Sequence, residues 1–287
     1  MSEFKPLISI GMPVFNSAVT LRDAICSILM QSYTNWELLI MDDGSTDDSM
    51  QIASVFADSR IKIFTDGENR GLAARMNQAV NMSRGELFAR MDADDIAYPR
   101  RLSVQQAYLQ GHPAVDLLGC GCLVFSKGES SYGMRTYPEM HKGICASPWS
   151  GILLMHPTWM GKTSWFRGSA YNEKLKKAQD QELLLRMFNQ SVFANTPEIL
   201  MAYRQDQTGL KKTVLSRYYV MRAMYTSGSV RIAILGIIIQ VAKILIDVTL
   251  SIFGQRIRLI QRRSKPASDI AIGEWRDVLH AVQQRDT

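Results

Sequence analysis

The sequence predicts an α/β fold in which a mostly parallel sheet is flanked by helices and followed by a helical region at the C-terminal end. Two observations support this class. Short runs rich in Ile, Leu, Val and Phe alternate with helical patterns between residues 7 and 92, and aspartates recur where these runs end. Strands that alternate with helices at intervals of roughly 25 to 30 residues form right-handed βαβ units, whose strands lie parallel.

The expected elements follow one another closely. The first run, LISIGMPVF, suits a buried strand, and in the next segment apolar residues recur at spacings of three and four, which is the helical period. Ser45 stands where the second helix should begin, because its hydroxyl can cap a free backbone N–H. In chain order we expect strands at 7–15, 36–44, 61–66 and 86–92, with helices between them at 18–31, 45–57 and 72–83.

The composition is that of an ordinary folded protein. The chain has 287 residues, of which 46% are hydrophobic and 21% charged, so a disordered chain is excluded. Its net charge is +6, but acidic clusters gather in the first hundred residues and basic residues between 204 and 265. This asymmetry indicates a basic tail on a near-neutral or acidic domain, and no nucleic-acid partner is expected.

Cysteine usage and the first residues both suggest a reducing, cytoplasmic location. The four cysteines lack metal-ligand spacing and are expected to be small buried hydrophobic residues. The segment MSEFKPLISI lacks a charged stretch followed by a long apolar core, so no signal peptide is expected.

Polar residues mark the carboxyl ends of all four expected strands. In an open parallel sheet these ends face one crevice, so we expect the side chains to converge there. Crowded carboxylates need a cation, and oxygen ligands without His or Cys favour Mg²⁺ or Mn²⁺, completed by substrate phosphates. The sequence therefore indicates a metal ion that bridges to a nucleotide diphosphate. The residues are Pro13, Phe15, Asn16, Asp42, Asp43, Asp66, Asp92, Asp94 and Asp95.

Each acidic segment also has a simpler interpretation. DGSTD at 43–47 is compatible with a turn and a helix cap, and Asp94-Asp95 with the start of a helix whose first turn holds Pro99. Placement at the ends of two strands of one sheet favours a ligand site. Other crevice-binding enzymes lack their motifs: a dinucleotide-binding domain needs three spaced glycines where only Gly11 is present, and no P-loop ending is found.

Six segments together resemble a known family. ISIGMPVFN, WELLIMDDGSTD, ENRGLAARMNQAV, GELFARMDADD, HPTWM and AQDQELLLRM occur in the order typical of family 2 glycosyltransferases of the GT-A fold. The resemblance implies a Rossmann-like α/β domain that transfers a sugar from a nucleotide diphosphate donor with inversion at the anomeric carbon. It assigns residues 1–110 to nucleotide-sugar binding and 111–205 to acceptor binding and the catalytic base.

The resemblance also implies roles for single residues. Asp43 would accept a hydrogen bond from the base, which favours uracil and hence a UDP-sugar. Arg75 belongs to the block that closes over the nucleotide, one position earlier than the family's Arg, and His156 either contacts the donor phosphates or packs. The residues implied in nucleotide-sugar binding are Pro13, Phe15, Asn16, Asp43, Arg75, Asp92, Ala93 and His156, and those implied in binding Mn²⁺ or Mg²⁺ are Asp94 and Asp92.

Sugar transfer also requires a general base for the acceptor hydroxyl. The resemblance places it at Asp180, in the segment KKAQDQELLLRMF, where Gln179 replaces the Glu usual in the family. Between 111 and 155 the chain is Gly-rich and is expected to be irregular. Acceptor recognition usually lies in this stretch, and its sequence does not identify the acceptor.

The last part of the chain, 206–287, is predicted to be a helical, basic and amphipathic region. An apolar helix carries a polar stripe that includes Gln240, Lys243 and Asp247, and the cations Arg256, Arg258, Arg262, Arg263 and Lys265 follow it. A helix in the plane of the cytoplasmic leaflet, with 230–265 on the membrane surface, accounts for these features. The alternatives are packing on the domain, packing in a homo-oligomer, and a membrane span, although charges at mid-bilayer are costly.

The resemblance, together with the acidic strand ends, therefore implies a metal-dependent inverting glycosyltransferase. We expect it to use a lipid-linked or oligosaccharide acceptor at the cytoplasmic face of the inner membrane, in surface polysaccharide synthesis. Two alternatives stay open: a non-catalytic nucleotide-sugar or membrane-binding module, and a metal-dependent nucleotidyltransferase. The joint presence of Asp92, Asp94 and Asp180 favours the enzyme, and the lack of a basic loop at 7–20 argues against the nucleotidyltransferase.

Overall fold

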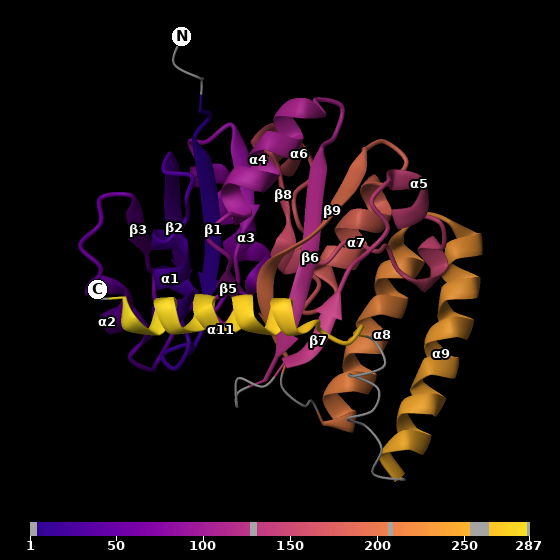
Figure 1. Cartoon of the computed structure of the whole chain (residues 1–287). Coiled ribbons are helices and arrows are strands. Elements are labelled where there is room, and N and C mark those ends of the chain that lie inside the picture. Colours follow the sequence, from indigo (N-terminus) through magenta and orange to yellow (C-terminus); the bar gives the residue numbers. More distant parts are fainter. Residues whose placement is uncertain (1–4, 127–130, 206–208, 253–263, 286–287) are drawn as a thin grey trace.

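The computed structural model describes residues 5–126, 131–205, 209–252 and 264–285, and it has the predicted alternation of strands and helices (Figure 1). All seven predicted elements of the first part are present. The strands are β1 (Ile8–Val14), β2 (Trp36–Asp42), β3 (Ile61–Phe64) and β4 (Leu87–Arg90). The helices between them are α1 (Leu21–Leu29), α2 (Ser49–Ser54) and α3 (Leu72–Met82).

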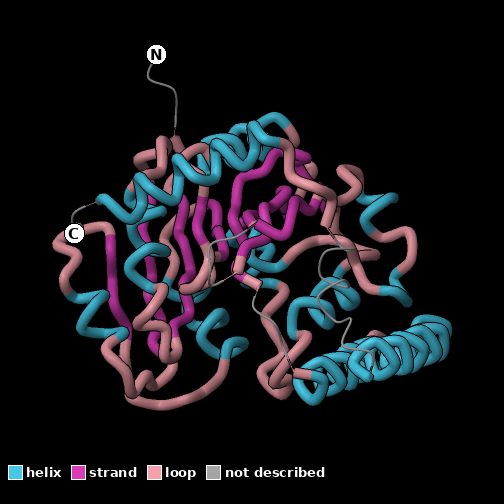
Figure 2. The backbone as a smooth tube through the Cα atoms, turned by 60° about the horizontal axis from the view of Figure 1, so that its bottom comes forward, coloured by secondary structure: helices cyan, strands magenta, loops and turns pink. Residues whose placement is uncertain are grey.

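The described strands form one sheet, in the order β3-β2-β1-β4-β8-β6-β9-β5, with β7 paired to β6. β1 to β4 lie parallel, as predicted, whereas β8 is antiparallel to both β4 and β6, and β6 and β9 pair in parallel. Helices lie on both sides of the strands (Figure 2). The further strands are β5 (Ile96–Ala97), β6 (Leu117–Phe125), β7 (Ser131–Arg135), β8 (Met160–Lys162) and β9 (Phe193–Arg204). The further helices up to β9 are α4 (Arg101–Gly111), α5 (His141–Ile144), α6 (Thr163–Gly168) and α7 (Gln179–Met187).

Two local predictions were wrong. The stretch 111–155 is not irregular, because it contains β6, all nine residues of which are buried, and β7. Two glycines inside β6 interrupt its apolar run, and at Gly119 a side chain would collide with Asn195, so the glycine allows close packing with β9. Ser45 does not cap α2, whose N-cap is Asp48. Instead, the Ser45 hydroxyl accepts a bond of 3.1 Å from the backbone N–H of Asn16 and joins two loops.

The C-terminal helix α11 (Asp269–Gln284) crosses one face of the sheet and belongs to the core (Figure 1). Its apolar residues recur at helical spacing, which explains why one side is buried. Trp275 is 2% exposed and its ring lies 4.7 Å from that of Phe125 in β6. The buried residues of this helix are Trp275, Val278, Leu279 and Val282.

Helices α8 (Leu210–Thr226) and α9 (Val230–Ile252) stand together at one edge of the molecule (Figures 1 and 2). At Gly236 a side chain would collide with Met224, so the glycine permits their close approach. The polar stripe of α9 faces inward, since Gln240 and Asp247 are each 3% exposed. Asp247 forms an ion pair of 2.6 Å with Arg217 of α8.

The outward face of α9 is apolar. Within the described residues, the segment Val230–Ser251 is long and apolar enough to cross a membrane by length and composition. The exposed residues of this face are Val230, Ile234, Ile237, Ile238, Val241, Leu245 and Ile246. Of the predicted cations, Arg256, Arg258, Arg262 and Arg263 lie outside the described residues, and the Lys265 backbone bonds to that of Met134 at 2.8 Å.

Candidate active site

A cavity of about 600 Å³, here called the strand-end pocket, opens where β1, β2 and β4 end. Phe15 is 50% exposed there, which is unusual for a large aromatic side chain. Arg204, from the end of β9, also lines the pocket, and no sequence pattern had indicated it. Seven of the predicted site residues line this cavity: Pro13, Phe15, Asn16, Asp43, Asp92, Ala93 and Asp94.

The carboxylate of Asp43 is held by the segment that precedes α3. One oxygen accepts bonds from the backbone N–H groups of Arg70 at 2.7 Å and Gly71 at 2.9 Å. Gly71 has φ 88°, a left-handed conformation that glycine adopts without strain. The Arg75 guanidinium adds a bond of 3.1 Å from Nε. The loop after β3 is therefore folded around Asp43 and fixes its position in the pocket.

Arg75 lies behind Asp43 and is not a pocket-lining residue. Its side chain is 1% exposed, and its other nitrogens bond to Asp66 at 2.5 and 2.9 Å and to Gln78 at 2.9 Å. The carboxylates of Asp43 and Asp66 compensate the charge of Arg75, and its bond to Asp43 holds that carboxylate in place.

The predicted convergence of six aspartates on the crevice was only partly right. Asp42 is buried and does not line the strand-end pocket. Its carboxylate accepts bonds from the Ser45 backbone N–H at 3.0 Å and from the Thr65 hydroxyl at 2.9 Å. Asp66 is engaged by Arg75. β2 ends at Asp42, and the turn of the chain after it brings Asp43, and not Asp42, into the pocket.

Asp92, Asp94 and Asp95 form a cluster whose carboxylate oxygens lie within 4.8 Å of one another. Burial and the charge of Asp92 raise the pKa of Asp94 to about 6 and that of Asp95 well above its usual range. One Asp95 oxygen accepts a bond of 2.8 Å from the Arg204 backbone, and the other is buried without a partner among the described residues. An oxygen-only donor set with an unsatisfied carboxylate fits a hard divalent cation.

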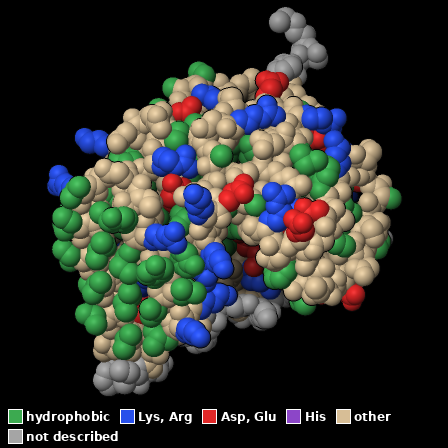
Figure 3. Space-filling view, turned by 180° about the vertical axis from the view of Figure 1, so that it is seen from behind, with side chains coloured by type: hydrophobic (Ala, Val, Ile, Leu, Met, Phe, Trp, Pro, Cys, Tyr) green, Lys and Arg blue, Asp and Glu red, His purple; other side chains and the backbone are tan. Residues whose placement is uncertain are grey.

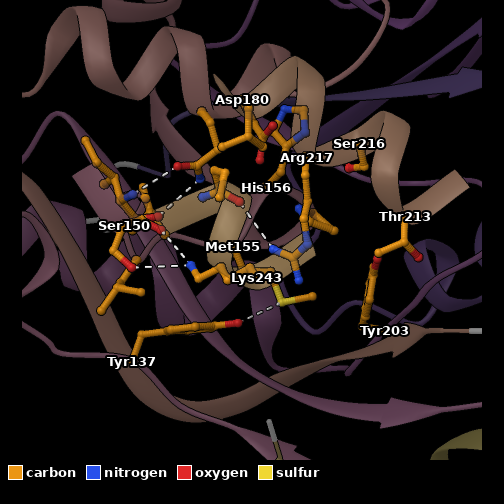
Figure 4. Close-up of a pocket in the computed structure, with 18 residues that line it drawn as sticks. Tyr137, Ser150, Met155, His156, Asp180, Tyr203, Thr213, Ser216, Arg217 and Lys243 are labelled. Atoms are coloured by element: carbon orange, nitrogen blue, oxygen red, sulfur yellow. Dashed lines mark hydrogen bonds between the residues drawn. The ribbon is translucent and has the colours of Figure 1, made fainter. Parts of the chain in front are cut away.

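A second cavity, of about 570 Å³, contains Asp180 and is called here the Asp180 pocket (Figure 4). Asp180 is the second residue of α7, and burial raises its pKa. The preceding Ala178 has φ 57°, a left-handed conformation that is unfavourable for alanine. Gln181 accepts a bond of 2.9 Å from the backbone N–H of Ile152 and donates one of 3.2 Å to its carbonyl, which joins α7 to the pocket wall.

His156 lines the Asp180 pocket and not the strand-end pocket. Its Nε2 lies 2.9 Å from the Tyr171 hydroxyl, and its ring packs edge-on against Trp159 at 4.5 Å. Burial and the charge of Arg90 hold the pKa of His156 well below 6.5, so the ring is neutral at physiological pH.

Arg90, at the end of β4, is a site residue that the sequence patterns did not single out. It is 3% exposed and pairs with Asp92 at 2.6 Å. Its Nε and Nη1 groups are buried without a hydrogen-bond partner in the described part of the chain. Burial raises the pKa of Asp180, and the charge of Arg90 offsets part of this rise, so Arg90 influences acids of both pockets.

Comparison with known proteins agrees with this geometry. The model of glycosyl transferase family 2 matches residues 9–183. EpsE of Bacillus subtilis, named as a glycosyltransferase, is 35% identical over 215 residues, which cover 72% of this chain and 76% of that protein. WfgD of Escherichia coli, named UDP-Glc:α-D-GlcNAc-diphosphoundecaprenol β-1,3-glucosyltransferase, is 40% identical over 99 residues, or 34% of this chain and 39% of that protein.

A solved structure shares the fold over nearly the whole chain. The mannosyltransferase from Pyrobaculum calidifontis in complex with GDP-Man and Mn²⁺ superposes with a TM-score of 0.62 and 15% identity, covering 98% of this chain and 86% of that one. This similarity supports the GT-A fold. From the extent of the family match and the identity to EpsE, the chain belongs to glycosyl transferase family 2.

Proposed function

We propose that the chain is a metal-dependent, inverting glycosyltransferase that transfers a sugar from a UDP-sugar to a hydroxyl of a lipid-linked saccharide, in surface polysaccharide synthesis. Family membership supports sugar transfer. The named activity of WfgD, with UDP-Glc and a diphosphoundecaprenol-linked acceptor, supports the donor and acceptor classes. In this proposal residues 1–110 bind the donor, 111–205 supply the acceptor site and base, and 206–287 hold the protein at the cytoplasmic face of the inner membrane.

The strand-end pocket would bind the nucleotide. The exposed ring of Phe15 offers a surface for the base, and the fixed carboxylate of Asp43 offers an acceptor for the N3–H of uracil. Arg204, whose Nε donates to the Asp94 carbonyl at 3.0 Å, places a positive charge beside the pocket, where a diphosphate would lie.

Asp94 and Asp92 would hold Mn²⁺ or Mg²⁺, with Asp95 supporting them from the interior. When bound, the ion would offset the negative charge that grows on the departing diphosphate. The raised pKa of Asp94 fits this role, because carboxylates that repel one another are stabilised by a shared cation.

Asp180 would act as the general base. Its carboxylate takes the proton of the acceptor hydroxyl while the hydroxyl oxygen attacks the anomeric carbon and the bond to the diphosphate oxygen breaks. A single displacement of this kind inverts the anomeric configuration. Burial raises the pKa of Asp180, which brings its basicity closer to that needed at neutral pH.

One observation carries the proposal: the acidic cluster and Asp180 lie in two pockets that share Arg90 as a charged neighbour. The test measures release of nucleoside diphosphate from a panel of nucleotide sugars with Mn²⁺. Asp180→Asn should lower transfer by about 10²-fold or more while donor binding persists. EDTA should abolish transfer, and Mn²⁺ or Mg²⁺ should restore it.

Two results would count against this function. Near wild-type transfer by Asp180→Asn would place the base elsewhere, and full activity in chelator would remove the metal from the reaction. Donor binding without release, for every nucleotide sugar and acceptor tried, would favour the non-catalytic binding module.

A further inference from the structure

The Asp180 pocket is partly built by the C-terminal helices. Figure 4 shows the side chains of Arg217 and Lys243 directed into the same space as Asp180. The family match ends at residue 183, so α8 and α9 lie beyond it. The residues that these two helices contribute include Thr213, Ser216, Arg217, Gln240 and Lys243.

Helix α9 thus has two different faces. Its polar face lines the Asp180 pocket through Gln240 and Lys243. Its outer face exposes aliphatic side chains such as Ile238 and Leu245, which are 60% and 62% exposed. Figure 3 shows this apolar patch at the lower left, with Lys and Arg side chains along its inner border. An exposed aliphatic face beside cations suits a bilayer surface, and it places the pocket close to lipid headgroups.

The two cations are held in position by neighbouring groups. Arg217 donates from Nε to Asp247 at 2.6 Å and from Nη1 to Gln240 at 3.2 Å, yet its side chain still lines the pocket. The Lys243 ammonium lies 3.4 Å from the Ser150 hydroxyl. Asp247 is 3% exposed and is not among the residues that line the pocket. It therefore orients the guanidinium without occupying the cavity.

We propose that Arg217 and Lys243 bind the diphosphate of a lipid-linked acceptor, whose lipid leaves the pocket along the outer face of α9. This inference rests on the proposed function and assigns the acceptor-phosphate site to the C-terminal helices. A guanidinium and an ammonium in one cavity match phosphate oxygens better than they match the hydroxyl groups of an uncharged sugar. The saccharide would then extend from the diphosphate toward Asp180.

The test uses binding to the full-length protein and needs no knowledge of the sugar. Farnesyl diphosphate, farnesol and inorganic pyrophosphate are titrated in EDTA, which prevents metal-assisted diphosphate binding in the strand-end pocket, and tryptophan fluorescence reports binding. Lys243→Gln removes one cation. The double variant Arg217→Gln/Asp247→Asn removes the other together with its counterion, so that no buried charge is left unpaired.

Each variant should raise the Kd for farnesyl diphosphate by about tenfold or more, the scale of a lost charge-assisted hydrogen bond. Farnesol affinity should stay the same, and so should every affinity of Lys211→Gln, a control at an exposed lysine of α8 outside the pocket. Unchanged farnesyl diphosphate affinity in both variants would overturn the assignment. Equal wild-type affinity for pyrophosphate and farnesyl diphosphate would show that the lipid part is wrong.

The two proposals fail in different experiments. Asp180→Asn should bind farnesyl diphosphate at least as tightly as the wild type, because the substitution keeps Arg217 and Lys243 and removes a negative charge from the same pocket. Absence of sugar transfer by the wild-type protein, with farnesyl diphosphate binding intact, would therefore argue only against the enzyme function.

Discussion

Replacing Arg75 with Met should destabilise the folded protein by about 3 kcal/mol, because the substitution leaves Asp43 buried without its cation. Breaking a buried ion pair costs roughly 3–5 kcal/mol. The lower end applies here, since the Asp43 carboxylate, in a residue 6% exposed, keeps the backbone bonds from Arg70 and Gly71. Asp66, the other partner, is 37% exposed and can be solvated by water.

Arg70→Met is the matched control. Arg70 precedes the same helix, but its side chain is 46% exposed and it approaches Asp66 only to 3.8 Å. Such a surface pair contributes about 0–1 kcal/mol. Urea denaturation followed by tryptophan fluorescence gives the free energy of unfolding of both variants. Similar losses for both would refute the reasoning that burial of Arg75 and Asp43 sets the cost.

The same variant distinguishes two roles for Arg75. If Arg75 only positions Asp43, Arg75→Met should weaken uridine and UDP binding by the same factor. A much larger loss for UDP than for uridine would show that Arg75 contacts a phosphate.

Three further predictions concern other parts of the molecule. In a pH–rate profile, kcat/KM should fall as pH drops through the raised pKa of Asp180, since only the ionised carboxylate accepts a proton. Arg90→Gln should move this acidic limb of the profile to higher pH, because it removes a charge that lowers the pKa. An acidic limb near pH 3.8 in the wild type would contradict the raised pKa. Ala178→Gly should stabilise the fold by about 1 kcal/mol in thermal unfolding, because left-handed backbone disfavours alanine, whereas Ala178→Val should destabilise it. Ile238→Asp/Leu245→Asp should reduce sedimentation with anionic vesicles, and unchanged sedimentation would make the α9 face an oligomer contact instead.

Sequence periodicity was sufficient for the first half of the fold. β1 to β4 are continuous apolar runs between helical patterns. The spacing of apolar residues predicted these elements, and the alternation of strands with helices predicted their parallel arrangement. Periodicity failed at β6, because a strand buried on both faces has no alternation and its glycines resemble loop residues.

The pocket residues were predictable where a motif places them at a strand end, as at Asp92 and Asp94. Position at a strand end could not separate Asp42 from Asp43, because the direction of each side chain depends on the local turn of the chain after β2, and only the family resemblance singled out Asp43. Arg90 and Arg204 were also missed. No motif marks either arginine, and only the three-dimensional structure shows that Arg90 is buried and that Arg204 lies beside the carboxylate cluster.

The orientation of α9 illustrates what a helical period can and cannot provide. The polar stripe was visible in the sequence, but a stripe on an apolar helix can face water, a membrane interior or a protein partner. In the structure, Arg217 of α8 pairs with Asp247, so the polar stripe of α9 faces α8 and the aliphatic residues face outward. One ion pair between two helices therefore couples the wall of the Asp180 pocket to the exposed aliphatic face of α9. Removal of Asp247 alone leaves the Arg217 charge buried and unpaired, so it should disturb acceptor use and vesicle binding together. The double neutral variant leaves no unpaired charge and should retain vesicle binding.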